Sequence, residues 1–255
     1  LYCGHHLGDQ LGTSAAGAQT FRLIQRPLEA PGNKVAAPTP RGTLFQSGTS
    51  NAAALTTRAA EQVLSAVRTV TSNATDLQAI PHALLVKALL VHTAEWPRSA
   101  IQVFERALRN ETNKSFFDDY VSAFLGYGVL QTDRALGCTA DRVTLVGGDV
   151  IGENETRLHR IPLPAALNAF TGRRRLTTTL AWFSPINPNS RKYRCAALSF
   201  VPPIDDRTPL RVSRTDVDLR AVGRGTVQHV VLERQSGAIN VGEGEVFEIP
   251  ITCVF

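Results

Sequence analysis

The chain has 255 residues, of which 43% are hydrophobic and 19% charged, so it is long enough for two ordinary domains with globular composition. Its net charge is +5, but the basic residues are scattered, and the one cluster, Arg173–Arg175, is too short to indicate a nucleic-acid partner. The longest apolar run, around Ala83–Val91, is interrupted by Lys87 and is shorter than a membrane span, so no membrane partner is expected.

The cysteines form no Cys-x-x-Cys pair, so we expect no zinc site, and the acidic residues show no metal-binding spacing that identifies another metal. They are Cys3, Cys138, Cys195 and Cys253. Reduced cysteines in a cytoplasmic, bacterial protein are favoured, and a secreted location stays open. Because the chain begins at Leu1 and contains no Met, we expect its N-terminal part, and any signal peptide, to be missing.

The first half of the chain is predicted to contain short strands followed by helices. Residues 1–40 are rich in Gly, Pro, Ala and Thr, with a short buried strand expected at Lys34–Pro38. A helix with apolar residues at helical spacing follows Ser50. Pro81 and Pro97 each open a further helix, because proline is tolerated in a first turn.

After Asp141 the periodicity changes to short β-rich runs separated by Gly, Pro, Asn and Ser. The predicted strands are Arg142–Val146, Leu158–Leu163, Leu176–Phe183, Tyr193–Phe200, Thr226–Leu232 and Val246–Val254. We therefore expect an all-β sandwich, jelly-roll-like, over residues 141–255, packed on the first half as an independent domain. Trp182 is the expected anchor of its core.

The most informative stretch runs from Gly48 through Thr49, Ser50 and Asn51 to Ala52, before an Ala-rich helix. A hydroxyl in the first turn of a helix lies beside unpaired N–H groups and the positive end of the dipole, which stabilise a developing oxyanion. The pattern thus predicts that Ser50 is a catalytic nucleophile, although a helix-capping serine is the commoner role of such a tripeptide. The esterase and lipase motif Gly-x-Ser-x-Gly is disfavoured by Ala52.

Three further segments, in order along the chain, accompany Ser50. They are Val35–Pro38, Val86–Leu90 with its Lys87, and Gly126–Leu130 followed by Ala135. Together with the Gly-Thr-Ser tripeptide they resemble the nucleophile region of the subtilases, the subtilisin-like serine proteases. The resemblance implies that residues 1–137 are the C-terminal portion of a subtilisin-like α/β domain with a partial parallel sheet. It also implies a serine endopeptidase with an Asp-His-Ser triad, a protein or peptide substrate and no cofactor.

The chain departs from the family at Asn51, where Met is usual, and at Ala54, where Pro is usual, which resembles a divergent bacterial branch. Only 49 residues precede Ser50, so the triad Asp and His and the oxyanion Asn are expected in a missing N-terminal half. His5, His6 and Asp9 do not follow the order Asp, His, Ser, whereas His92 is expected to be a hydrogen-bonded core residue. The alternative function is a non-catalytic binding or structural protein that keeps the fold.

Overall fold

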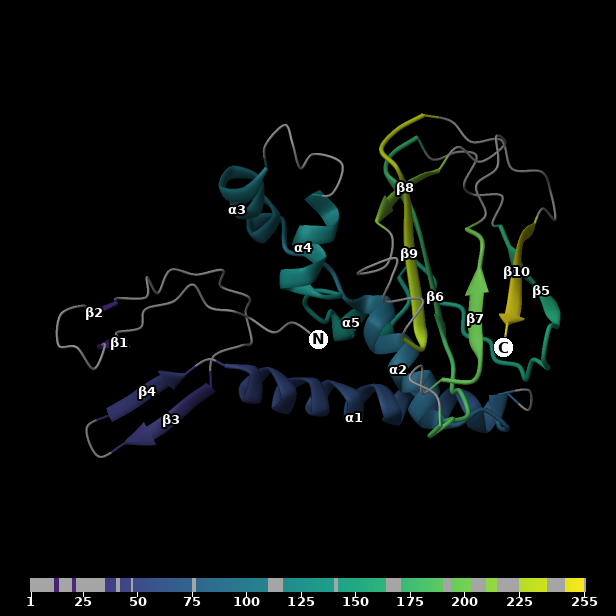
Figure 1. Cartoon of the computed structure of the whole chain (residues 1–255), viewed down its shortest axis with the longest axis horizontal. Coiled ribbons are helices and arrows are strands. Elements are labelled where there is room, and N and C mark those ends of the chain that lie inside the picture. Colours follow the sequence, from purple (N-terminus) through teal and green to yellow (C-terminus); the bar gives the residue numbers. More distant parts are fainter. Residues whose placement is uncertain are drawn as a thin grey trace.

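The structure, a computed structural model, combines helices with antiparallel sheets (Figure 1). It describes residues 12–13, 20–21, 35–39, 42–46, 48–74, 77–109, 117–139, 142–163, 171–189, 194–202, 210–214, 225–237 and 246–254. The helices are α1 (Thr49–Asn73), α2 (His82–Thr93), α3 (Arg98–Leu108), α4 (Phe117–Leu125) and α5 (Thr132–Leu136). The strands are β1 (Gly12–Thr13), β2 (Thr20–Phe21), β3 (Val35–Thr39), β4 (Gly42–Gln46), β5 (Thr156–Pro162), β6 (Arg174–Ala181), β7 (Ala197–Phe200), β8 (Arg211–Arg214), β9 (Val227–Arg234) and β10 (Val246–Val254).

The first core lies between the second half of α1 and α2. Its buried members are Val63, Val67, Leu77, Ile80, Leu85 and Leu89. The predicted helix starts are confirmed, because Pro81 and Pro97 immediately precede α2 and α3. Burial of α1 begins at Ala59, since residues 49–58 are exposed or partly exposed. The start of α1 therefore projects from the core rather than lying inside it (Figure 1).

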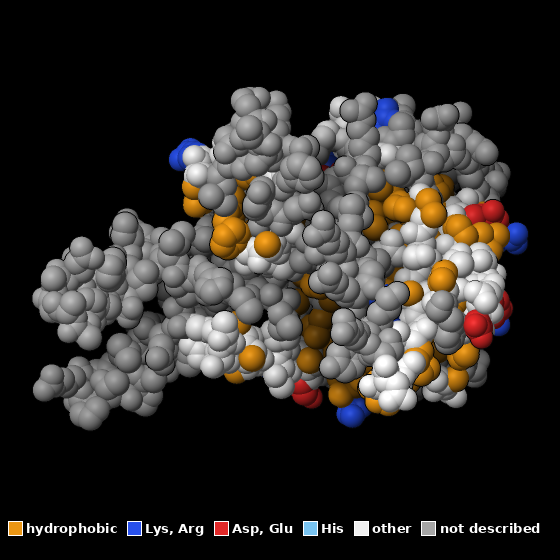
Figure 2. Space-filling view, in the orientation of Figure 1, with side chains coloured by type: hydrophobic (Ala, Val, Ile, Leu, Met, Phe, Trp, Pro, Cys, Tyr) orange, Lys and Arg blue, Asp and Glu red, His pale blue; other side chains and the backbone are white. Residues whose placement is uncertain are grey.

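A smaller core joins α3 to α4. It is formed by Ala100, Phe117, Val121 and Leu125, with Trp96 and Phe104 packed against them. The indole of Trp96 donates a hydrogen bond of 2.8 Å to the carbonyl of Gly126, which ties this pair to the turn after α4. Figure 2 shows hydrophobic side chains on the surface over α3 and α4 and again over the sheets.

Two three-stranded sheets, β5–β10–β7 and β6–β9–β8, share the second large core. Its buried members are Phe200, Leu210, Val230, Leu232, Phe247 and Ile249. Side chains alternate between the faces of a strand, so the even-numbered residues of β6 and β9 face this core. Gln228 extends from β9 to the other sheet, where its amide bonds both the N–H and the carbonyl of Phe200, at 2.8 and 3.0 Å.

The odd-numbered face of β6 and β9 is covered by α2 (Figure 1). The register pairs Arg175 with Glu233 and Thr179 with His229 on this face, and Val231 of β9 is also buried. β9 is accordingly buried on both sides, at the centre of three layers made by the helices and the two sheets. The sheets thus pack on the helices, as expected, whereas independent folding of residues 141–255 stays a prediction.

The expected parallel sheet of residues 1–137 is not found in the described residues, where every strand pairing is antiparallel. Val35–Pro38, the segment predicted to lead into the Ser50 loop as a strand, lies in β3 and pairs with β4, so that Val35 opposes Gln46. Two residues separate these strands, and a connection this short permits only an antiparallel hairpin. The mixture of helices and strands is therefore confirmed, and the parallel sheet stays a prediction.

The strand predictions after residue 150 are largely confirmed, with Val246–Val254 matching β10 residue for residue. Arg142–Val146 is wrong: beyond an isolated bridge between Thr139 and Arg142 it joins no sheet of the described residues. It follows α5 instead, where the Thr144 hydroxyl donates to the Arg134 carbonyl at 3.4 Å. Trp182 is buried as expected, at 3% exposure.

Position 128, in the turn after α4, requires glycine. Gly128 has a φ of 101°, and a Cβ there would lie 2.2 Å from the Glu95 carbonyl oxygen. We expect Gly128→Ala to lower the free energy of unfolding by more than about 2 kcal/mol, from backbone strain and this backbone clash. Gly147→Ala is the matched control, since a Cβ there meets nothing within 4 Å. Equal urea midpoints for the two variants would contradict this packing.

Candidate active site

Ser50 is the second residue of α1, one position after Thr49. Gly48 is the N-cap, in extended conformation, and its carbonyl accepts the first helical hydrogen bond from Ala52 N–H at 3.0 Å. Glycine provides no capping side chain, and no acidic residue occupies the first turn. The positive end of a 25-residue helix is thus not neutralised by its own side chains, and Ser50 lies there exposed.

The described residues bring no base to Ser50. Its hydroxyl makes no hydrogen bond within this part of the chain, and three of the described histidines contact threonines elsewhere, while His159 lies in β5 of the second half. His82 lies 3.2 Å from the Thr71 hydroxyl at the opposite end of α1, and His92 and His229 both contact Thr179. His5, His6 and Asp9 lie outside the described residues.

The densest polar cluster lies instead between α2 and the β6–β9 pair, and we name it the polar seam. Its members are Lys87, His92, Glu95, Arg134, Arg175, Thr179, Thr226, His229 and Glu233. At one end, the Lys87 ammonium donates to the Thr226 carbonyl at 3.2 Å and to the Thr226 hydroxyl. Burial lowers the pKa of Lys87.

At its centre, the polar seam contains two histidines that share one hydroxyl. Thr179 Oγ1 lies 3.2 Å from His92 Nδ1 and 2.8 Å from His229 Nδ1. His229 has no exposed surface, and the ring of Tyr127 meets it edge-on at 6.1 Å between centroids. The prediction that His92 is a hydrogen-bonded core residue is therefore confirmed for its hydrogen bond, with the side chain only partly buried.

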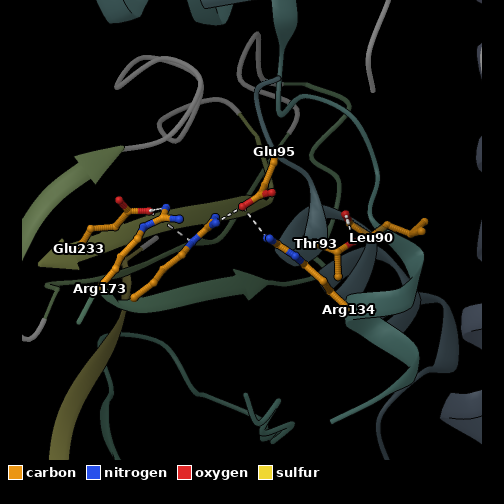
Figure 3. A network of polar contacts seen from close by, with 7 residues as sticks. Leu90, Thr93, Glu95, Arg134, Arg173 and Glu233 are labelled. Carbon is orange, nitrogen blue, oxygen red and sulfur yellow. Dashed lines mark hydrogen bonds and ion pairs between the residues drawn. The ribbon is translucent and has the colours of Figure 1, made fainter. Parts of the chain in front are cut away.

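At the other end, Glu95 connects the helices to the sheet through two arginines (Figure 3). Its carboxylate forms ion pairs with Arg134 of α5 and Arg175 of β6. Glu233 of β9 continues the network, 2.5 Å from Arg173 and 3.8 Å from Arg175. Glu95 also forms a backbone bridge with Val129, so its position is fixed by both main chain and side chain.

Sequence reasoning missed the polar seam, although one signal was present. The predicted strand Leu176–Phe183 places Thr177 and Thr179 on one face, opposite the apolar residues Leu176 and Leu180. Alternation of this kind is usually attributed to a solvent-exposed face. Here that face is covered by α2, and its polar groups pair across the interface.

The described residues reveal no other candidate site. No group of three or more His, Cys, Asp or Glu residues in the described ranges is arranged to hold a metal ion. Cys138, Cys195 and Cys253 are free thiols, and Cys3 lies outside the described residues. None of the described helices is long and apolar enough to cross a bilayer.

The chain is similar to the uncharacterized protein y4bN of Sinorhizobium fredii (strain NBRC 101917 / NGR234), with 28% identity over 116 residues. The match covers 46% of this chain and 25% of the relative, so the chain matches only a quarter of that protein's length. No family model and no solved structure matches the chain.

The ion pairs of Glu95 should stabilise the fold more than those at the surface. Glu95→Gln removes the charge that faces Arg134 and Arg175, and we expect the free energy of unfolding to fall by about 1–2 kcal/mol. Glu248→Gln is the matched control, because Glu248 forms only an exposed pair with Arg160 and its loss should cost less than about 0.5 kcal/mol. Urea unfolding of both variants checks this, and equal losses would contradict it.

Proposed function

We propose that this chain carries the nucleophile of a serine endopeptidase that resembles the subtilases, with Ser50 attacking the carbonyl carbon of a peptide substrate. The observation that carries the proposal is the position of Ser50, exposed in the first turn of α1, a turn that contains no acidic residue. Negative charge that develops on the substrate oxygen would be stabilised there by the helix N–H groups, that of Ser50 included.

Two further arrangements support the proposal. The Val86–Leu90 segment, which contains Lys87, lies in α2. This helix packs against α1 in the first core. The Gly126–Leu130 segment forms a turn fixed by the backbone bridge from Val129 to Glu95. Of the segments that resemble the subtilases, the Val86–Leu90 segment is therefore the one that packs against the helix of Ser50.

The remaining catalytic groups are assigned by chemistry. A serine hydroxyl reacts slowly until a base removes its proton, so a histidine must accept that proton and an aspartate must orient the histidine. We propose that these residues, an oxyanion Asn and the parallel strands of a subtilisin-like domain lie outside the described residues. Residues 1–137 would then be the C-terminal portion of that domain, and residues 141–255 an appended β-sandwich. The reaction needs no cofactor.

One observation favours the alternative, a non-catalytic binding or structural protein. Ser50 is exposed, but no histidine of the described residues contacts it. A protein that had lost its acid and base would retain α1 and the cores around it. The two functions differ in one measurable property, the reactivity of the Ser50 hydroxyl.

A fluorophosphonate probe measures that reactivity. We expect the protein expressed from its complete gene to be labelled at Ser50, with the adduct located by mass spectrometry. The 255-residue chain alone should react no faster than free serine, because the described residues place no base beside Ser50. Rapid labelling of this chain would show that it contains a base, and His5 or His6 would then be the candidates.

Substitutions separate the chemistry from the fold. Ser50→Ala should abolish labelling and peptide cleavage and change the free energy of unfolding by less than about 0.5 kcal/mol, because Ser50 is exposed. Ser65→Ala is the matched control, on an exposed serine of the same helix, and should leave labelling unchanged. Peptide cleavage that persists in Ser50→Ala would exclude the subtilase-like mechanism, and an unlabelled complete protein would favour the non-catalytic alternative.

A further inference from the structure

The chemistry at the centre of the polar seam is independent of the reactivity of Ser50. The Thr179 hydroxyl of β6 is hydrogen-bonded to two histidines from different layers. They are His92 of α2 and His229 of β9. A threonine hydroxyl has one proton, so it can donate to only one of the two Nδ1 atoms. The other ring must donate its own Nδ1 proton to the hydroxyl. The arrangement is therefore satisfied by two neutral histidines that carry their protons on different nitrogens.

The charges around the two rings disfavour an added proton. The groups in the same interface are Lys87 of α2, Glu95 after α2, Tyr127 after α4, Arg134 of α5, Arg175 of β6 and Glu233 of β9. The Glu95 carboxylate already pairs with Arg134 and Arg175. The Glu233 carboxylate likewise pairs with Arg173 and Arg175. Neither of these two carboxylates is therefore left to balance the charge of a protonated His92.

We propose that the Thr179 hydroxyl and its two histidines form a pH-sensitive latch, which holds α2 against the β6–β9–β8 sheet near neutral pH and releases it in acid. Protonation of His92 places an imidazolium in the partly buried interface between α2 and the sheet, where Glu95 is already paired with two arginines. Separation of the layers relieves this, because water then solvates the imidazolium. The cores on either side of the interface contain no titratable groups and are not affected in this way.

The direction of the pH dependence follows from the same geometry. Burial, with smaller contributions from Arg175 and Arg134, lowers the pKa of His92 from its ordinary 6.5 to about 4. The docked state therefore binds fewer protons than the released state. Its extra stability is fully present above pH 6.5 and is lost as the pH falls from 6.5 toward 4.

Amide hydrogen exchange on the full chain tests the latch directly. Exchange rates, corrected for the intrinsic effect of pH, are measured between pH 7.5 and pH 4.5 for peptides from α2, β9 and β10. We expect protection of α2 and of the β9 residues that face it to fall roughly 10- to 100-fold over this range. Protection of β10 should stay constant, because its core lies on the other side of the sheet. Constant protection of α2, or equal loss in β10, would overturn the proposal.

A variant pair identifies the titrating group. His92→Asn keeps a polar atom at the δ position but does not titrate, so most of the acid-induced loss of α2 protection should disappear. His82→Asn is the matched control on the same helix, since His82 bonds Thr71 within the helical layer, and it should behave as the unmodified chain. The same loss in His92→Asn as in the unmodified chain would overturn the proposal.

An NMR titration of the unmodified chain needs no variant. The His92 ring should remain neutral at pH 5.5 while the layers are docked. A His92 ring that titrates near pH 6.5 with α2 protection intact would overturn the latch even if His92→Asn failed to fold.

Discussion

The layered arrangement depends on the contact between α2 and the odd-numbered face of β6 and β9. β9 is buried on both sides, by the second sheet on one face and by α2 on the other. The first face is joined mainly by hydrophobic packing, with the Gln228 amide bonded to Phe200, whereas the second is joined largely by polar groups that pair across the interface. Buried polar groups are costly unless they are satisfied, so this contact tolerates only one register between helix and sheet.

The same contact has consequences for Ser50. α2 packs on α1 from Val63 onward, and the polar seam joins α2 to the sheet. The polar seam therefore fixes α1, the helix whose first turn contains Ser50, indirectly through α2. The first half of α1 receives no comparable support from the described residues, where side chains before Ala59 remain exposed or half-exposed. Ser50 is therefore placed by the length and rigidity of one helix rather than by a packed pocket. That geometry suits a nucleophile only if other residues surround it.

The sequence was informative wherever one local rule determined the structure. Proline before α2 and α3, the β-branched residues of β6 and the alternation in β10 each predicted an element that is present. Arg142–Val146 was not predictable in this way, because its strand-like composition is outweighed by contacts with α5. The antiparallel β3–β4 hairpin was missed because Val35–Pro38 was compared with a family motif without regard to the short connection that follows.

The polar seam was beyond sequence reasoning for a physical reason. Thr179 and His92 are 87 positions apart, and their contact depends on the docking of two layers rather than on local periodicity. The candidate nucleophile, by contrast, rests on the local Gly-Thr-Ser pattern at a helix start, and local patterns are what a sequence displays.

The central claim is that Ser50 is a nucleophile that attacks a peptide carbonyl, and a peptidyl boronate tests it most directly. Boron accepts a serine oxygen to form a stable tetrahedral adduct that resembles the intermediate of peptide hydrolysis. In a crystal structure of the protein expressed from its complete gene, the account predicts a covalent bond from boron to Ser50 Oγ. A boronate oxygen should lie within hydrogen-bond distance of the Ser50 N–H. An unmodified Ser50 at saturating boronate, or an adduct on another side chain, would contradict the account.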